Sequence, residues 1–190
     1  MNEDEFAKSL LAHERREWQN PEKIIAQIDV KKGMVVADLA CGPGFFVVPL
    51  ARAVGESGRV YAVDSSELML GYLRSNLERS GTQSQNVTIY KSDVSQTNIP
   101  SASCDIVLFA NILHDLDYPS EFLTEVKRIS KLNALIVDID WKDIDNGFGP
   151  PRDIRMSETK AQGILKKGGL VLVRSIDPGP YHYGLVLKVP

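Results

Sequence analysis

Two aspartates and two glycines between residues 38 and 64 have the types and spacing of a ligand-binding site. Gly42 and Gly44 follow an apolar run, and without a Cβ they let a ligand lie directly on the backbone. The helix-like run after them presents free amide groups to the same place. Asp64 ends the next apolar run, where a carboxylate can bind both hydroxyls of a ribose. The pattern predicts a site for a ligand that contains a nucleoside.

The fingerprint of a dinucleotide site is only partly present. That fingerprint has a third glycine, and Val47 stands in its place. Asp38, just before the turn, would repel a pyrophosphate, whereas it suits a ligand with a positive group such as the α-ammonium of a methionine moiety. These features argue against an NAD-dependent oxidoreductase, which is kept as the less favoured alternative.

The stretch DLACGPGF, residues 38–45, resembles the first motif of class I S-adenosyl-L-methionine (SAM) dependent methyltransferases. Three later segments resemble the ends of the next strands in that family: Tyr61–Asp64, Lys91–Val94 and Phe109–His114. The resemblance covers most of residues 31–190 and is closest to the small-molecule branch, similar to ubiquinone and menaquinone methyltransferases. It implies SAM as the cofactor and transfer of its methyl group to an acceptor. A non-catalytic SAM-binding or interaction module is the alternative.

The resemblance also implies roles for single residues. Asp64 would bind the ribose, with an acid that stabilises a helix start as the alternative. Asp93 would hold the amino group of the adenine, with a turn in which it bonds its own backbone as the alternative. The full set expected to contact the cofactor is Asp38, Ala40, Gly42, Gly44, Asp64, Ser65, Asp93, Val94 and Asn111.

His114 and Asp140 are the candidates for the catalytic side. The methyl group of SAM is already activated by the sulfonium, so a protein mainly aligns the acceptor. A base is needed only when the acceptor must lose a proton. His114 has a side chain that ordinarily titrates near pH 6.5, and a surface histidine at a helix start is an equally favoured alternative. Asp140 ends a strand and could point at the acceptor. Trp141 could line the acceptor pocket, although a purely structural role in core or loop packing is slightly favoured for it.

Strands and helices alternate along the chain, which indicates parallel βαβ units with helices on both faces of one sheet. Only Asp177–Pro180 separates the last two strands, so they should form an antiparallel hairpin. The expected fold is α/β: a doubly wound, mostly parallel seven-stranded sheet with a C-terminal antiparallel hairpin, a Rossmann-like methyltransferase fold. The predicted strands are 34–39, 59–63, 86–90, 104–109, 134–140, 170–176 and 183–189, and the predicted helices are 44–54, 67–79, 119–130 and 157–167.

The length of 190 residues fits a single domain, 1–190. Residues 1–19 are interpreted as an N-terminal arm, and Asn20 with Pro21 as a helix start. The one long irregular stretch, Lys142–Arg155, leaves a strand end at the edge where ligands bind in open α/β sheets. We expect it to form part of the wall or lid of the acceptor site.

Composition argues against several other classes. With a net charge of -3, the chain lacks the excess of basic residues that is typical of nucleic-acid-binding proteins. No apolar run approaches the roughly 20 residues that span a bilayer, and the acidic N-terminus lacks the layout of a signal peptide. Two cysteines and three scattered histidines argue against a metal site. We therefore expect a cytoplasmic protein with a small-molecule acceptor, whose identity the sequence leaves open together with the oligomeric state.

Overall fold

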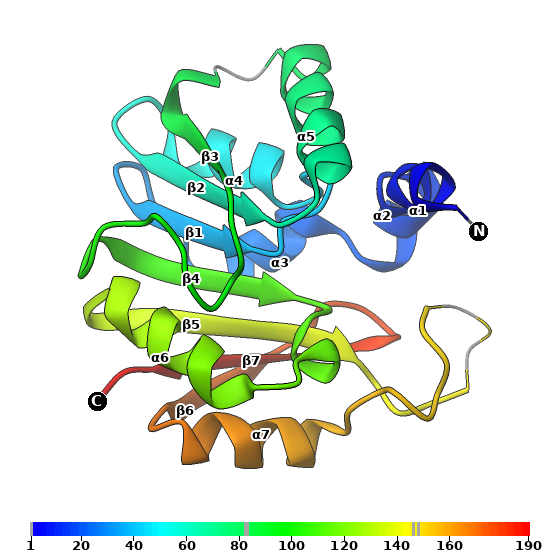
Figure 1. Cartoon of the computed structure of the whole chain (residues 1–190), viewed down its shortest axis with the longest axis vertical. Coiled ribbons are helices and arrows are strands. Elements are labelled where there is room, and N and C mark those ends of the chain that lie inside the picture. The colour runs from blue at the N-terminus through cyan, green and yellow to red at the C-terminus, as the bar shows by residue number, and fades with distance from the viewer. Residues whose placement is uncertain (1, 82–83, 146, 148) are drawn as a thin grey trace.

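The computed structural model describes residues 2–81, 84–145, 147 and 149–190. Its centre is a seven-stranded sheet in the order β3-β2-β1-β4-β5-β7-β6 (Figure 1). Strands β1 to β5 run parallel, and β7 is antiparallel to both of its neighbours. The expected fold, with its C-terminal hairpin, is confirmed. The strands are β1 (Val35–Leu39), β2 (Arg59–Asp64), β3 (Val87–Lys91), β4 (Cys104–Ala110), β5 (Ser130–Trp141), β6 (Val171–Ile176) and β7 (His182–Lys188).

Helices cover both faces of the sheet (Figure 1). Alternate residues of each strand point to opposite faces, so the sheet has two separate clusters of buried apolar side chains. The helices against one face are α3 (Pro21–Gln27), α4 (Val47–Val54) and α5 (Glu67–Arg79), and those against the other are α6 (Pro119–Ile129) and α7 (Glu158–Lys167). In the described part of the chain, no helix has the length and apolar character needed to cross a membrane.

Local sequence signals set where several helices begin. The Asn20 side chain accepts a hydrogen bond from the Lys23 amide at 2.9 Å, and Pro21 occupies the first turn of α3, as predicted. Ser66 caps α5 in the same way, accepting from the Met69 amide at 3.3 Å. Because Ser66 lies two residues after the end of β2, this cap fixes the start of α5 at the edge of the sheet that carries the predicted site.

Two predicted boundaries are wrong for identifiable reasons. Helix α4 begins at Val47 and not at residue 44, because Gly44 has a left-handed φ of 89° that prolongs the turn. Strand β5 begins at Ser130, four residues earlier than predicted, directly after α6. Asn133, with a φ of 63°, lies in this first part of β5, and the register with β4 shifts there. A polar, irregular start of this kind does not show the alternation by which strands are recognised.

The N-terminal arm forms two short helices, α1 (Glu3–Leu10) and α2 (His13–Trp18). They lie beyond the carboxyl ends of the parallel strands, at the right of Figure 1. The Ser66 hydroxyl donates to the Glu3 carboxylate at 2.6 Å, and the Tyr72 hydroxyl donates to Asp4, which ties α1 to α5. The arm therefore covers the edge of the sheet where open α/β folds bind ligands.

Asp138, near the end of β5, is an acid inside the apolar core. It is fully buried, and neither carboxyl oxygen has a hydrogen-bond partner among the described residues. Burial, with the nearby charge of Asp140, raises the pKa of Asp138 well above its usual value. The folded protein therefore favours the neutral acid at this position.

Replacing Asp138 with asparagine should flatten the pH dependence of stability. In the unfolded chain Asp138 loses its proton above about pH 4, whereas the folded protein retains it, so the free energy of unfolding falls as pH rises. The largest slope that one proton gives is about 1.4 kcal/mol per pH unit. Urea denaturation between about pH 5 and pH 8 should show a smaller decline for Asp138→Asn than for the original chain. If the free energy of unfolding declines with pH to the same extent in both proteins, Asp138 is not held neutral in the folded state.

Candidate cofactor and acceptor site

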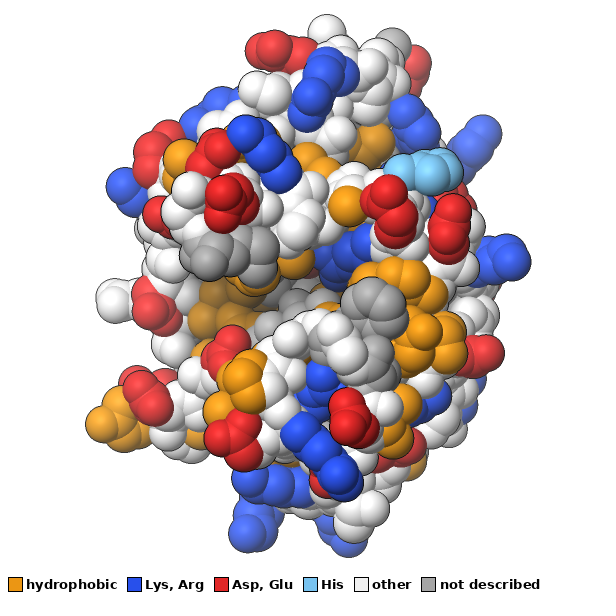
Figure 2. Space-filling view, turned by 90° about the vertical axis from the view of Figure 1, so that its right-hand side faces the viewer, with side chains coloured by type: hydrophobic (Ala, Val, Ile, Leu, Met, Phe, Trp, Pro, Cys, Tyr) orange, Lys and Arg blue, Asp and Glu red, His pale blue; other side chains and the backbone are white. Residues whose placement is uncertain are grey.

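A hollow lies between the carboxyl edge of the sheet and the N-terminal helices, and Figure 2 looks onto this edge. Its volume is about 430 Å³, and we refer to it as the glycine-turn hollow. It brings together residues from the ends of three neighbouring strands, β1, β2 and β4. Of the residues predicted to contact the cofactor, those that line it are Asp38, Ala40, Gly42, Asp64, Ser65 and Asn111.

The backbone around this hollow adopts conformations that L-residues rarely take. Ala40 and Asn111 have φ values of 57° and 59°, although neither is glycine. Such residues cost roughly 1–3 kcal/mol each and cluster at ligand sites. Gly44 has its own reason to be glycine, because a Cβ there would overlap Leu73 of α5. The turn is thus packed tightly against α5 while Gly42, with a φ of 53°, faces the hollow.

Asp64 links the glycine turn to the segment that begins α5. One of its carboxylate oxygens accepts from the Gly42 amide at 2.8 Å, and the other accepts from the Ser66 amide at 2.9 Å. The bond to Ser66 is the one expected of an acid at a helix start. A carboxylate has about four lone-pair positions, so both oxygens keep capacity for the hydroxyls of a ligand. The ribose role of Asp64 stays a prediction.

Asp38 is buried in the wall of the hollow. Only 2% of it is exposed, and its Oδ2 has no hydrogen-bond partner among the described residues. The pKa of Asp38 is raised to about 8, mainly by burial and further by the charge of Asp64, while the charge of Arg15 opposes the rise. The Oδ1 of Asn111 is likewise buried without a partner in the described structure. Buried acceptors without donors are costly, so both atoms are suited to a ligand that supplies N–H or O–H groups.

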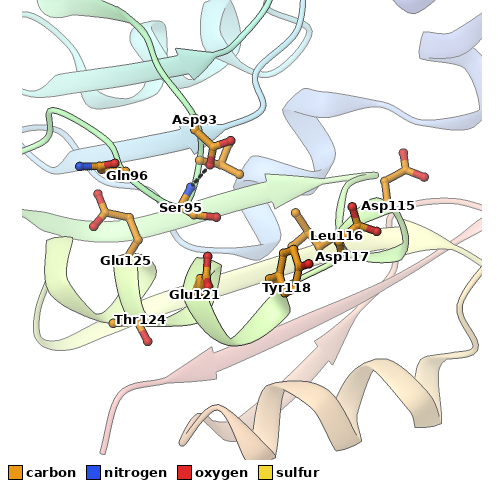
Figure 3. A pocket seen from close by; sticks show the side chains of 11 residues that line it. Asp93, Ser95, Gln96, Asp115, Leu116, Asp117, Tyr118, Glu121, Thr124 and Glu125 are labelled. Atoms are coloured by element: carbon orange, nitrogen blue, oxygen red, sulfur yellow. Dashed lines mark hydrogen bonds between the residues drawn. The ribbon is translucent and has the colours of Figure 1, made fainter.

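The structure does not bring Asp93 and Val94 into the glycine-turn hollow. They line another hollow of about 680 Å³, the acidic hollow, which lies beside α6 and the segment before it and shares Asp115 with the glycine-turn hollow (Figure 3). The Oδ1 of Asp93 accepts from the Ser95 amide at 2.7 Å, which is the local turn named above as its alternative. The chain after β3 turns toward α6 and carries both residues with it. The adenine contact of Asp93 is therefore still only a prediction.

A third hollow, of about 540 Å³, adjoins the glycine-turn hollow, and we refer to it as the aromatic hollow. Its apolar lining consists mainly of Phe6, Leu10, Trp18, Trp141 and Pro150. The residues that line both hollows are Phe6, Leu10, Arg15, Asn111 and Asp115. A ligand in one hollow therefore lies next to a ligand in the other.

The long stretch 142–155 was expected to border the acceptor site. Gly149 and Pro150 do line the aromatic hollow, and Trp141, from which the stretch leaves the sheet, lines it too. Residues 146 and 148 lie outside the described residues. A Cβ at Gly149 would overlap the Trp141 ring, so this glycine lets the stretch pack closely on the tryptophan.

His114 and Asp140 form a hydrogen-bonded pair at the edge of the aromatic hollow. His114 lies in the short helix η2 (Leu113–Asp115), and its Nδ1 is 2.7 Å from Asp140 Oδ1. The His114 amide also donates to Asp140 Oδ2 at 3.2 Å. Burial opposes the charged imidazolium, but the hydrogen bond to Asp140 and the charges of Asp140 and Asp115 outweigh it, so the pKa of His114 is raised. The histidine lines the aromatic hollow.

The expectation that Asp140 itself faces the acceptor needs correction. Asp140 is fully buried and does not line the aromatic hollow. It points to the same face of the sheet as Asp138, the face covered by α6 and α7, and it lies beneath η2. Asp140 is therefore linked to the aromatic hollow through His114, whose ring it orients.

Arg15 is a site residue that the sequence did not reveal. It comes from α2, is 8% exposed, and lines both the glycine-turn and the aromatic hollow. Its one local signal is the spacing to Gln19, four residues later, to which its Nε donates at 2.9 Å. That spacing is common on any helix, so only the packing of the arm onto the sheet identifies this arginine.

His182, at the start of β7, packs against two tryptophan rings. The His182 ring stacks on Trp18, with ring centroids 5.6 Å apart, and lies 4.0 Å from the Trp141 ring. Burial lowers the pKa of His182 to about 3, so it is neutral. This packing holds both tryptophans in the wall of the aromatic hollow.

The methyltransferase domain family matches residues 37–137, more than half of the chain. A solved structure of a SAM dependent methyltransferase from Aquifex aeolicus is 32% identical, covers 100% of both chains and superposes with a TM-score of 0.92. This chain belongs to the SAM-dependent methyltransferases. The demethylmenaquinone methyltransferase of Geobacillus stearothermophilus is 28% identical over 66% of this chain and 53% of its own. The ubiquinone/menaquinone biosynthesis C-methyltransferase UbiE of Burkholderia vietnamiensis is 27% identical over 63% and 48%. This methyltransferase thus spans about half the length of these curated relatives.

SAM is the cofactor of this family, and the glycine-turn hollow of this methyltransferase fits it. The turn at Gly42 exposes backbone to the hollow, as close approach of a ligand requires. The unpartnered oxygens of Asp38 and Asn111 suit the ammonium and hydroxyl donors that SAM carries. Asp64 lies at the end of the neighbouring strand, where ribose hydroxyls bind in doubly wound folds.

Proposed function

We propose that this protein transfers the methyl group of SAM to a small, largely apolar acceptor bound in the aromatic hollow. The observation that carries this proposal is the adjacency of the two hollows, which share Phe6, Leu10, Arg15, Asn111 and Asp115. The sulfonium of bound SAM supplies an electrophilic methyl group. The protein then has to hold an acceptor atom next to it, and adjoining hollows do this without any large movement.

The residues of the chain take distinct parts in this proposal. Asp64 and the glycine turn orient the nucleoside, and Asp38 binds the ammonium group. Trp18 and Trp141 give the acceptor a flat apolar surface and exclude water from it. Two relatives are named for ubiquinone and menaquinone synthesis, which makes a quinone precursor a suitable acceptor to test first.

His114 is the proposed general base where the acceptor carries a proton that must leave. With Nδ1 held by Asp140, Nε2 can accept that proton. Asp140 then stabilises the resulting imidazolium and keeps the ring in place. Asp140 is a positioning residue, because it is buried beneath His114 and does not line the hollow.

The proposal is tested by incubating the purified protein with trideuteromethyl SAM and a metabolite extract. The label should appear in a small compound that partitions into organic solvent, and boiled protein should give none. A label found only in protein or nucleic acid would contradict the small-molecule acceptor. Binding of SAM without any labelled product from extracts that contain quinone precursors would favour the alternative of a non-catalytic SAM-binding module.

A further inference from the structure

Arg15 is a buried cation whose contacts among the described residues are with neutral groups. Its Nε donates to Gln19 Oε1 at 2.9 Å, and its Nη1 donates to the Leu10 carbonyl at 3.0 Å. The guanidinium carbon lies 3.9 Å from the centre of the Phe45 ring. Among the described residues, the ion pairs involve other cations and none includes Arg15. A buried charge without an opposite charge in contact is costly, so this position calls for an anion.

The guanidinium lies where the two hollows meet, since Arg15 lines both of them. Asp38 lines the glycine-turn hollow as well and has a buried oxygen without a partner in the described structure. The charges of the two groups act on each other, because Arg15 opposes the rise in the pKa of Asp38 and Asp38 opposes the fall in the pKa of Arg15. They are nevertheless not in contact as an ion pair. A cation and a carboxyl thus border the same space.

We propose that Arg15 binds the carboxylate of the amino-acid group of SAM, while Asp38 binds its ammonium. The proposal rests on the assignment of SAM to the glycine-turn hollow. An α-amino acid carries both charges on one carbon, so a single ligand group satisfies both buried residues. Arginine suits this role because its planar guanidinium binds carboxylates through two parallel hydrogen bonds. The N-terminal arm then forms part of the cofactor site.

A carboxylate on the acceptor is the other source of the same chemistry, because Arg15 also lines the aromatic hollow. Three probes separate the two sources. S-adenosylhomocysteine carries the whole amino-acid group, its decarboxylated form keeps only the ammonium, and methylthioadenosine has neither. The matched control variant is Arg16→Gln, because Arg16 lies on the same helix but bonds Glu22 at 3.0 Å and lines neither hollow.

Binding of the three probes is measured by titration calorimetry. The original chain and Arg16→Gln should prefer S-adenosylhomocysteine over its decarboxylated form by about tenfold to a hundredfold, the usual scale for hydrogen bonds to a charged group. Arg15→Gln should lose this preference and bind the decarboxylated form as the original chain does. Arg15→Lys, which keeps the charge, should keep part of the preference. Asp38→Asn should weaken both amine-bearing probes and leave methylthioadenosine unchanged.

The ratio of affinities within one variant does not depend on how much of that variant is folded. An Arg15→Gln protein that keeps the full preference would overturn the proposal. Equal binding of S-adenosylhomocysteine and its decarboxylated form by the original chain would also overturn it, and would leave the acceptor as the source of the carboxylate. Failure of the original chain to bind any of the three probes would instead contradict the assignment of SAM to the glycine-turn hollow.

Discussion

Replacing His114 with glutamine should lower the turnover by about a hundredfold to ten-thousandfold for an acceptor that loses a proton, the usual contribution of a general base. Glutamine keeps a polar side chain of similar length but cannot take up the proton. The affinity for S-adenosylhomocysteine should change little, because His114 lines the aromatic hollow and not the glycine-turn hollow. Steady-state kinetics with the acceptor, together with calorimetric titration, measure the two effects separately.

His13→Gln is the matched control, because His13 is an exposed histidine at the start of α2. It should leave turnover unchanged. An unchanged turnover in His114→Gln as well would remove the general base from the mechanism and leave His114 as part of the wall.

The dependence of turnover on pH carries a further signature of the His114–Asp140 pair. A base must be neutral to accept a proton, so turnover should rise as pH passes through the raised pKa of His114, above its usual value of about 6.5. Asp140→Asn removes the hydrogen-bonded charge that favours the imidazolium, so the rise should move to lower pH. Turnover at high pH should also fall, because the ring loses its orienting partner. A rise at the same pH in both proteins would contradict the role of Asp140.

Replacing Asp64 with asparagine should weaken the binding of S-adenosylhomocysteine by about 1.5–3 kcal/mol, the scale for hydrogen bonds to a charged group. Asparagine keeps the shape and one of the two acceptor oxygens that hold the Gly42 and Ser66 amides. The fold should therefore survive, as thermal unfolding can verify, while the charged contact to the ribose is lost. Titration calorimetry gives the affinities.

Asp105→Asn serves as the control for Asp64. Asp105 pairs with Lys131 at 2.8 Å and lies near the start of β4, at the opposite edge of the sheet. The Asp105→Asn protein should bind S-adenosylhomocysteine as tightly as the original chain does. If Asp64→Asn does the same, the acid at the end of β2 has only its structural role at the start of α5.

The sequence predicts the sheet and its hairpin well because the strands are short apolar runs with clear breaks between them. Part of the lining of the glycine-turn hollow was also expected from the sequence, since Asp38, Gly42 and Asp64 lie at or just after strand ends. Local rules suffice there, because parallel strands bring their carboxyl ends to one edge.

Features that depend on segments packing over that edge could not be predicted in the same way. Arg15 reaches the site from α2, which lies over that edge together with α1, and α1 is tied to α5 through Ser66 and Tyr72. The hydrogen bond between His114 and Asp140 joins residues 26 positions apart, and no local sequence pattern indicates that the two side chains meet. Asp93 lies just after the end of β3, as expected, yet the direction of the chain after that strand carries it into the acidic hollow.

Calorimetric unfolding in the presence of SAM, S-adenosylhomocysteine and NAD tests most directly whether this chain binds the methyltransferase cofactor. A ligand specific for the folded state stabilises it by about 2.7 kcal/mol when present at a hundred times its dissociation constant. SAM and S-adenosylhomocysteine should each raise the melting temperature, and NAD should leave it unchanged. A rise with NAD and none with either SAM or S-adenosylhomocysteine would contradict the assignment.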